Sequence, residues 1–355
     1  MVGNPRMLWF WFGFFAFVAV LLALDLGVLN RNPHAPSLKS AAYWTAGWMA
    51  LGFAFTGFVY LMYENAWLGA TLVEPSKSPG GDASIMYVSA YLLEYALSVD
   101  NIFVISLLFH SFRVPAKYQH RVLFWGIMGA IVFRLAMLGG GAWLAHKFSW
   151  IFYVFGAYLA YQGFKLLRHD EDEDASTEKS FAVRTLRRFV RIVDGDYNGK
   201  FSVMVDGRRA LTTVAVCLIS IELTDIVFAL DSIPAVLSVS QDIFIMVTSN
   251  IFAIMGLRSL YFVLAGAMDK FKYLKIALAI LLMVIGLKMV LHGHVHIPHA
   301  LSLGIIAGII GVGVLASVIS TRRAGKTMTE EDAEVVEPPP PPPEPEAEPP
   351  RARPR

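Results

Sequence analysis

The chain has 355 residues, of which 56% are hydrophobic and only 16% are charged, and its formal net charge is +2. A soluble domain of this length needs fewer apolar residues to fill its core, so the composition excludes an ordinary soluble protein and is typical of a polytopic membrane protein. The basic residues are scattered between apolar blocks, which disfavours a nucleic-acid partner. The single cysteine, Cys217, cannot form an intrachain disulfide.

Apolar segments long enough to cross the hydrocarbon core of a membrane, about 20 residues each, recur along the chain. We predict an all-α polytopic membrane protein with nine transmembrane helices. The predicted spans cover residues 8–29, 41–62, 84–110, 121–145, 149–167, 211–237, 243–267, 273–291 and 298–320. Residues 1–63 therefore hold two N-terminal helices. The first contains Asp25 and has no small-residue cleavage site behind it, so we expect a retained helix and not a signal peptide.

Two polar regions lie outside the spans. Residues 168–210 begin with the acidic run DEDED, which we interpret as a solvated linker, and continue through the basic, amphipathic TLRRFVRIV. They end in a predicted hairpin that turns at Asp206 and Gly207. Residues 321–355 contain EPPPPPPEPEAEPPRARPR, which is too rich in proline to fold, so we expect a disordered tail.

The distribution of lysine and arginine predicts the orientation of the chain. Their excess lies in the loops after the first, third, fifth and seventh spans and after the ninth. By the positive-inside rule these loops face the cytoplasm, so the amino terminus lies outside and the carboxyl terminus lies in the cytoplasm. The histidine-rich run HGHVH, residues 292–296, then falls in an outer loop. It either captures a cation or is a plain solvated loop, and both interpretations stay open.

Two groups of three spans share landmarks in the same order. Residues 84–167 and 211–291 each contain two acids six residues apart, then an arginine inside an apolar run, then a lysine. The matched pairs are Glu94 with Asp225, Asp100 with Asp231, Arg134 with Arg258, and Lys165 with Lys288. Because the two groups cross the membrane in opposite directions, the landmarks predict an inverted repeat of spans three to five and six to eight. Such repeats are typical of secondary transporters, whose substrate site lies at the repeat interface near the bilayer midplane.

Carboxylates inside spans are the candidate binding groups. Each costs about 2.5–3.5 kcal/mol at the centre of a span, so each needs a partner. The candidate acids are Glu94, Asp100, Glu222, Asp225 and Asp231, and the candidate charge partners are Arg134 and Arg258. Five acids against two arginines leave three negative charges, which require cations or protons. Oxygen ligands without cysteine or histidine in the same spans select Mg²⁺, Mn²⁺ or Ca²⁺ over Zn²⁺ or Cu⁺.

Pro234 lies three residues after Asp231 in the sixth span. Since proline removes a backbone donor and clashes with the carbonyl four residues before it, we predict a helix break that re-aims Asp231 and frees backbone carbonyls as ligands. In the third span, Ser98 and Asn101 beside Asp100 compete for the backbone, and a similar unwinding is expected there.

These motifs resemble a known family. The segments LLEYALSVDNIFVI, ELTDIVFALDSIPAV and TSNIFAIMGLRSLYF strongly resemble the TerC family of integral membrane proteins, and LALDLGV and DGR resemble its longer, nine-span Alx-like members. The resemblance covers residues 8–320 and implies manganese export across the bacterial inner membrane. It places the motif acids of the family on the five candidate acids, with Asn101 beside them. The HGHVH loop and the proline-rich tail have no counterpart and inherit no role.

We therefore expect a secondary transporter that exports a hard divalent cation, Mn²⁺ first, with proton exchange as a hypothesis and with no organic cofactor. Some relatives are implicated in metallating or assembling secreted and membrane proteins, and this is the alternative function. If the acids only locked helices to the arginines, two arginines would have to satisfy five carboxylates, which disfavours a purely structural role.

Two further classes of protein are weaker interpretations. An intramembrane aspartyl protease would use Asp100 and Asp231 as a dyad, but each has a second acid six residues earlier and lacks a glycine-flanked motif, so we expect no enzyme. A membrane scaffold would use residues 168–210 and the tail to dock partners, although the basic piece there is also suited to lying on anionic lipid.

Overall fold

The computed structural model describes residues 5–27, 38–72, 76–168, 191–193, 195, 197–205, 207–265, 272–291, 295 and 297–334. Several sequence features discussed above lie outside these residues. They are the DEDED run, most of TLRRFVRIV, Asp206, the histidines of HGHVH and the tail residues 335–355, and the side chain of Asp25 is also outside the description. The expectation of a disordered tail over residues 321–355 is wrong for residues 321–334, which continue the helix His299–Glu334.

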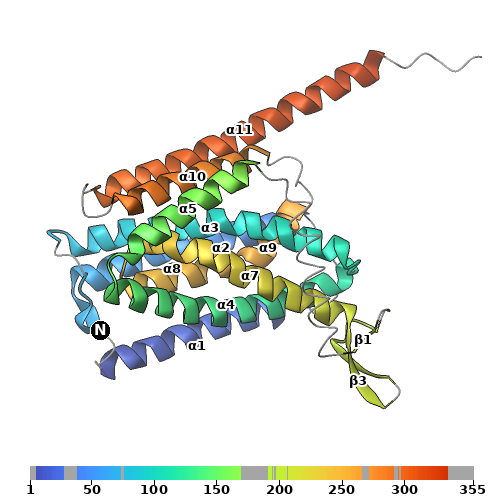
Figure 1. The fold of residues 1–355 in the computed structure, drawn as a ribbon, viewed down its shortest axis with the longest axis horizontal. Coiled ribbons are helices and arrows are strands. Elements are labelled where there is room, and N and C mark those ends of the chain that lie inside the picture. The colour runs from blue at the N-terminus through green and yellow to red at the C-terminus, as the bar shows by residue number, and fades with distance from the viewer. Residues whose placement is uncertain are drawn as a thin grey trace, which may run out of the picture.

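The described chain is a helical bundle with one small sheet at its end (Figure 1). The helices before the sheet are α1 (Pro5–Gly27), α2 (Leu38–Glu64), the short 3-10 helix η1 (Trp67–Gly69), α3 (Pro79–Ser111), α4 (Ala116–Lys147) and α5 (Ile151–Arg168). The sheet comprises β1 (Ile192–Val193), β2 (Ser202–Val205) and β3 (Arg208–Thr212). The helices after it are α7 (Thr213–Leu237), α8 (Ile243–Met255), α9 (Leu257–Ala265), α10 (Lys272–Val290) and α11 (His299–Glu334). In Figure 1, α5, α10 and α11 gather on one side of the bundle and α1 lies at the opposite edge.

The sheet is attached to the beginning of α4. Strands β2 and β3 form the predicted antiparallel hairpin, and β1 adds to β3 in parallel, in the order β1-β3-β2. The Nη1 atom of Arg121 donates to the carbonyl of Gly199 at 3.1 Å, and its guanidinium lies 4.8 Å from the centre of the Phe201 ring. Gly199 has φ +67°, and a Cβ there would lie 2.5 Å from the Tyr118 ring, so only glycine fits. The sheet is thereby fixed against one end of the helix that carries Arg134.

Six helices are long and apolar enough to cross a membrane, and the bent pair of α8 and α9 makes up to seven if it is one span. The six are α2, α3, α4, α7, α10 and α11. Helix α1 contributes only a shorter apolar stretch, Trp9–Leu24, among the residues whose placement the structure describes. Each predicted span coincides with a helix or a helix pair, but nine crossings stay a prediction. The all-α polytopic architecture is confirmed.

The predicted helix break at Pro234 is wrong. Helix α7 is continuous from Thr213 to Leu237, with Pro234 in its last turns, and Ser238 N donates to the carbonyl of Pro234 at 3.0 Å. Proline costs one backbone hydrogen bond, but residues 232–237 are all buried, and their packing holds the helical path. Helix α3 is also continuous through Asp100 and Asn101, so the unwinding expected there is absent as well.

The one broken span among the described helices lies elsewhere. Helices α8 and α9 are bent by 43° relative to one another, with Gly256 at the break and Arg258 directly after it. The N–H of Gly256 reaches only the carbonyl of Ile254, while the hydroxyl of Ser259 donates to the Gly256 carbonyl at 3.0 Å. Glycine lacks a side chain to fill the helix surface and has a low helix propensity, which suits it to this position. The break therefore lies next to the arginine of the second predicted repeat, whereas the acids lie on the continuous helices α3 and α7.

Glycines let α5 and α10 approach closely. A Cβ on Gly156 would lie 2.7 Å from the carbonyl oxygen of Gly286, and one on Gly163 would lie 2.6 Å from that of Ala279. Gly163 and Gly286 occupy matched positions, each two residues before a matched lysine. Gly156 and Ala279 are also matched, because Gly156 lies seven residues before Gly163 and Ala279 lies seven residues before Gly286. The two contacts are therefore reciprocal, as expected where matched helices of a duplicated unit pack together. The inverted repeat itself stays a prediction.

Candidate functional site

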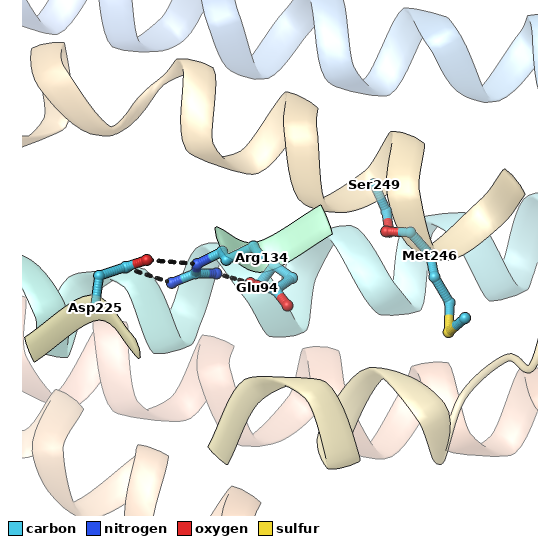
Figure 2. A network of polar contacts seen from close by, with 5 residues as sticks. All are labelled: Glu94, Arg134, Asp225, Met246 and Ser249. Atoms are coloured by element: carbon cyan, nitrogen blue, oxygen red, sulfur yellow. Dashed lines mark hydrogen bonds and ion pairs between the residues drawn. The ribbon is translucent and has the colours of Figure 1, made fainter. Parts of the chain in front are cut away.

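Glu94, Arg134 and Asp225 form an ion triad within the bundle (Figure 2). The Nη1 atom of Arg134 lies 2.5 Å from Glu94 Oε2, and its Nη2 atom lies 3.0 Å from Asp225 Oδ1. The Nε atom also donates to Asp225 Oδ2, at 3.3 Å, so the Asp225 contact is bidentate. Such paired, charge-assisted bonds are the strong class of hydrogen bond. The triad joins the centre of α3, the centre of α4 and the middle of α7.

Asn101 completes the surroundings of this arginine. With its amide oriented to suit its neighbours, Asn101 accepts a hydrogen bond from Arg134 Nη2 at 2.9 Å and donates to the carbonyl of Leu97 at 3.2 Å. Asn101 lies seven residues, or about two helical turns, after Glu94, so both side chains stand on one face of α3. Arg134 therefore binds three of the predicted site residues at once.

With both carboxyl groups ionised, two carboxylates surround one guanidinium and the triad carries a net charge of −1. Glu94 and Arg134 are 0% and 1% exposed, which removes solvent as a source of compensation. Isolated charges are costly in such an environment and attract counter-charge or protons. The triad is therefore a place where one further positive charge is favoured.

Polar groups with unused bonding capacity lie beside Glu94. Its Oε1 atom is buried and has no hydrogen-bond partner. Ser232 of α7 and Asn250 of α8 are near the same carboxyl group, but neither Ser232 Oγ nor Asn250 Nδ2 completes a hydrogen bond. Buried polar groups in native proteins are usually satisfied, so orphaned ones mark a missing ligand, proton or water. Here they extend the triad with hydroxyl and amide groups.

Asp231 belongs to a separate polar cluster. Gln162 of α5 donates through Nε2 to both carboxylate oxygens of Asp231, at 3.0 and 3.2 Å, and the same nitrogen is 3.1 Å from the hydroxyl of Tyr158. Asp231 lies six residues after Asp225 on α7, a rise of about 9 Å. Because α7 is a continuous helix through Pro234, the two carboxylates keep this separation.

Glu222 lies against α4, about one turn before Asp225. Its carboxyl atoms fill the place of an absent side chain, since a Cβ on Gly129 would fall 2.1–2.3 Å from them. The Oε2 atom of Glu222 is buried and has no hydrogen-bond partner. Glu222 therefore sits beside the triad as an acid whose bonding capacity is not used.

Asp100 and Arg258 lie outside the triad. Asp100 is half-buried on α3 and is engaged in a polar contact of its own. The Nη1 atom of Arg258 lies 2.8 Å from His120 Nε2, at the beginning of α4. Next to this contact the hydroxyl of Tyr261 donates to Gln119 Oε1 at 3.1 Å, so α9 is attached to the start of α4.

The predicted cage of oxygen ligands is therefore divided. Glu94, Asp225 and Asn101 meet at Arg134, Asp231 lies with Gln162, and Glu222 lies between α7 and α4. Within the described part of the chain, no three His, Cys, Asp or Glu side chains converge as a metal-binding group. The positive charge between Glu94 and Asp225 is the guanidinium of Arg134.

Comparison with known proteins identifies the family. A sequence profile described as "Integral membrane protein TerC family" matches residues 80–325, which covers the chain from α3 into α11. The chain belongs to the TerC family. No solved structure matches it.

Similar TerC proteins occur in several bacteria. An "Uncharacterized membrane protein STKORF319" of Myxococcus xanthus is 41% identical over 323 residues, which cover 91% of this chain and 95% of the relative. The "Putative membrane-bound redox modulator Alx" of Escherichia coli (strain K12) is 41% identical over 310 residues, 87% of this chain and 93% of the relative. An "Uncharacterized membrane protein" of Rickettsia bellii is 36% identical over 309 residues, 87% and 97% of the two chains.

Several residues that contact the candidate acids or Arg258 could not be identified from the sequence alone. Gln162 and Tyr158 are four residues apart on α5 and read as ordinary polar residues at the end of a span. His120 lies at the start of α4 in a predicted loop. Asn250 falls in the TSN segment that carries the family resemblance, which was the one signal available for it. The others become visible only when α4, α5 and α7 are placed side by side.

Proposed function

We propose that this TerC protein exports a hard divalent cation, with Mn²⁺ as the first candidate, across the bacterial inner membrane. The observation that carries the proposal is the pairing of Glu94, which is fully buried, and Asp225, whose side chain is 14% exposed, with a single guanidinium; these are the matched acids of the two predicted repeats. Acids on different spans are costly and mark ion pathways in membrane proteins, and one guanidinium offsets only one of these two charges.

The ligand types support the class of cation. Carboxylate oxygens of Glu94 and Asp225, the amide of Asn101 and the hydroxyl of Ser232 are hard oxygen donors, which suit Mn²⁺, Mg²⁺ and Ca²⁺. The preference for Mn²⁺ and the outward direction are implied by the family resemblance. The cation would enter as substrate, and carboxylates left without it would take protons, so exchange of the cation for protons is part of the proposal.

The name of the Escherichia coli relative contains the words redox modulator, which suggests a role in redox state. In this chain the only cysteine, Cys217, is 0% exposed within α7, which disfavours exchange between two thiols of the protein. A redox effect through the supply of a metal ion would agree with both features. The alternative function is a membrane factor that supports metallation or assembly of secreted and membrane proteins.

Flux measurements in proteoliposomes test the transport proposal. Wild-type protein and the variants Glu94→Gln and Asp225→Asn are compared for uptake of Mn²⁺, Mg²⁺, Ca²⁺ and Zn²⁺, with a pH indicator inside the vesicles. We expect Mn²⁺ flux with an opposite change in lumenal proton concentration, and loss of flux in both variants. Asp82→Asn is the matched control, because Asp82 lies in the first turn of α3 and contacts only Ser76 in the hydrogen bonds described. Equal flux in wild-type and empty vesicles would overturn the proposal.

A second arm separates transport from assembly. Removal of the tail from residue 335 leaves every helix of the bundle in place. A transporter keeps its Mn²⁺ flux without the tail, whereas a factor that docks partners through the tail loses its cellular phenotype while flux is unchanged or absent.

A further inference from the structure

Arg134 occupies the position that a bound cation would need. Its guanidinium donates to Glu94, to Asp225 and to Asn101, so Glu94 Oε2, both carboxylate oxygens of Asp225 and the amide oxygen of Asn101 are already bound to a positive charge of the chain. A divalent cation cannot share these oxygens with the guanidinium, because the two positive charges would repel at contact distance in a medium of low dielectric constant. Binding of one therefore requires displacement of the other.

We infer that Arg134 is a tethered counter-ion that competes with the transported cation for Glu94 and Asp225, and that Glu222 accepts the guanidinium when the cation binds. The inference rests on the proposed function and deepens it by naming the group that binds Glu94 and Asp225 when no cation is bound. In this proposal Glu222 binds the guanidinium of Arg134 and is not a ligand of the cation.

The position of Glu222 supports this second role. Glu222 lies about one helical turn before Asp225 on the same helix, with its carboxyl group against Gly129 of α4. Gly129 lies five residues before Arg134, and long side chains in a helix lean toward its N-terminal end. The proposal requires the guanidinium to move toward Gly129, about 7.5 Å along α4, by a change of side-chain rotamers.

Glu222 also has the bonding capacity to receive it. Its Oε2 atom is buried and without a hydrogen-bond partner, so an arginine arriving there would satisfy an acceptor that is orphaned in this structure. The exchange conserves the number of charge-assisted pairs, because the cation takes Glu94 and Asp225 while Arg134 takes Glu222. A buried site can then load and unload without leaving an arginine unpaired in the membrane.

A purely structural role for Arg134 predicts the opposite result on substitution. If the arginine only locks α3, α4 and α7 together, its removal loosens the site and weakens cation binding. If it competes with the cation, its removal strengthens cation binding while transport slows, because nothing displaces the cation again. The direction of the change in affinity therefore separates the two roles.

The first test measures Mn²⁺ affinity by titration calorimetry on full-length protein in nanodiscs, together with flux in proteoliposomes. We expect Arg134→Gln to bind Mn²⁺ at least about tenfold more tightly than wild type and to transport it more slowly. Arg134→Lys retains the charge and should keep an affinity near that of wild type. Arg121→Gln is the matched control, since it removes one arginine from the same helix at the contact with Gly199, and its affinity should be unchanged. Unaltered or weaker binding by folded Arg134→Gln would overturn the inference.

The second test does not depend on the stability of the Arg134 variant. Glu222→Gln in the otherwise wild-type protein keeps the triad and removes the alternative acceptor for the Arg134 guanidinium. It should therefore weaken Mn²⁺ binding. Gly129→Ala displaces the same carboxyl group and should have the same effect. In the Arg134→Gln background Glu222→Gln should have no further effect, because the arginine that it serves is gone. Equal losses in both backgrounds would make Glu222 a direct ligand and overturn its assigned role, as would an unchanged affinity of Glu222→Gln in wild type.

The outcomes for the inference and for the proposed function are distinct. Wild-type flux of Mn²⁺ combined with unaltered affinity in the Arg134 and Glu222 variants overturns the inference alone. Absence of Mn²⁺ binding and flux in the wild type overturns the proposed function and the inference with it.

Discussion

Arg134 and Arg258 stand at matched places in the sequence, but their surroundings differ. Arg134 lies on the continuous helix α4 and binds Glu94 and Asp225, whereas Arg258 follows a 43° bend between α8 and α9 and lies beside His120. The first half of the molecule thus provides a fixed cation between acids. The second provides a broken helix attached to the start of α4. From this difference we predict that the two units have separate tasks, cation binding in one and shape change in the other.

The largest expected effect comes from removing the positive charge of the first half. Arg134→Met leaves Glu94 and Asp225 buried and uncompensated, which should cost about 3–5 kcal/mol of stability. Thermal unfolding in detergent checks this as a lowered midpoint. The triple variant Arg134→Met, Glu94→Gln, Asp225→Asn removes all three charges and should regain most of the loss. If the single variant unfolds at the wild-type temperature, the triad does not hold the two units together.

The contact of α5 with α10 ranks next, because it relates the two halves through glycines. Gly286→Val adds atoms where even a Cβ would lie 2.6 Å from the carbonyl of Gly156. Backbone must move to make room, at a cost of about 1–3 kcal/mol. Gly139→Ala on α4 is the control, since nothing lies within 4 Å of its Cβ position and alanine favours the helix. Similar unfolding temperatures for the two variants would contradict close packing of α5 on α10.

Part of this arrangement was predictable from sequence. Matched acids and arginines predicted that Glu94, Asp225 and Arg134 would come together, because ionisable residues inside spans must find one another. The hairpin of β2 and β3 also followed from its turn residues. These features depend on local patterns or on charge, and both are visible along the chain.

Other parts depend on tertiary packing and were missed or wrong. Pro234 did not break α7, since buried neighbours on all sides keep the helix together at the loss of one hydrogen bond. The bend appeared at Gly256 instead, in a segment whose matched partner lies within the continuous helix α4. Gln162 donates to Asp231 although it lies 69 positions earlier in the chain, so no local sequence pattern predicts this contact. A single shared cage was expected because the acids were counted together, but six residues of the continuous helix α7 separate Asp225 from Asp231.

A smaller effect concerns the start of the bent pair. Asp242 caps α8 and accepts hydrogen bonds from Phe244 N at 2.9 Å and Ile245 N at 3.4 Å, whereas α4 begins after Pro115 without a side-chain cap. Asp242→Ala should cost about 1 kcal/mol, as expected for loss of an N-cap, and Asp242→Asn should retain most of it. Denaturant unfolding of the three proteins measures the difference. Equal losses for alanine and asparagine would assign the effect to charge and not to capping.

The smallest effect on stability should be the most informative about motion. Gly256 has φ −78°, and a Cβ there would meet its neighbours at 3.5–3.9 Å, which is ordinary contact, so Gly256→Ala fits the folded chain. It should stabilise the protein by about 0.4–1 kcal/mol by restricting the unfolded state. If the break between α8 and α9 changes its angle during transport, the same substitution should slow Mn²⁺ flux while leaving Mn²⁺ affinity unchanged. The matched change Val132→Gly on α4, 62% exposed, should lower stability by up to about 1 kcal/mol and leave the bend untouched. A normal rate in Gly256→Ala would mean that the bend is a fixed shape, and the division of tasks between the halves would then rest on the ion triad alone.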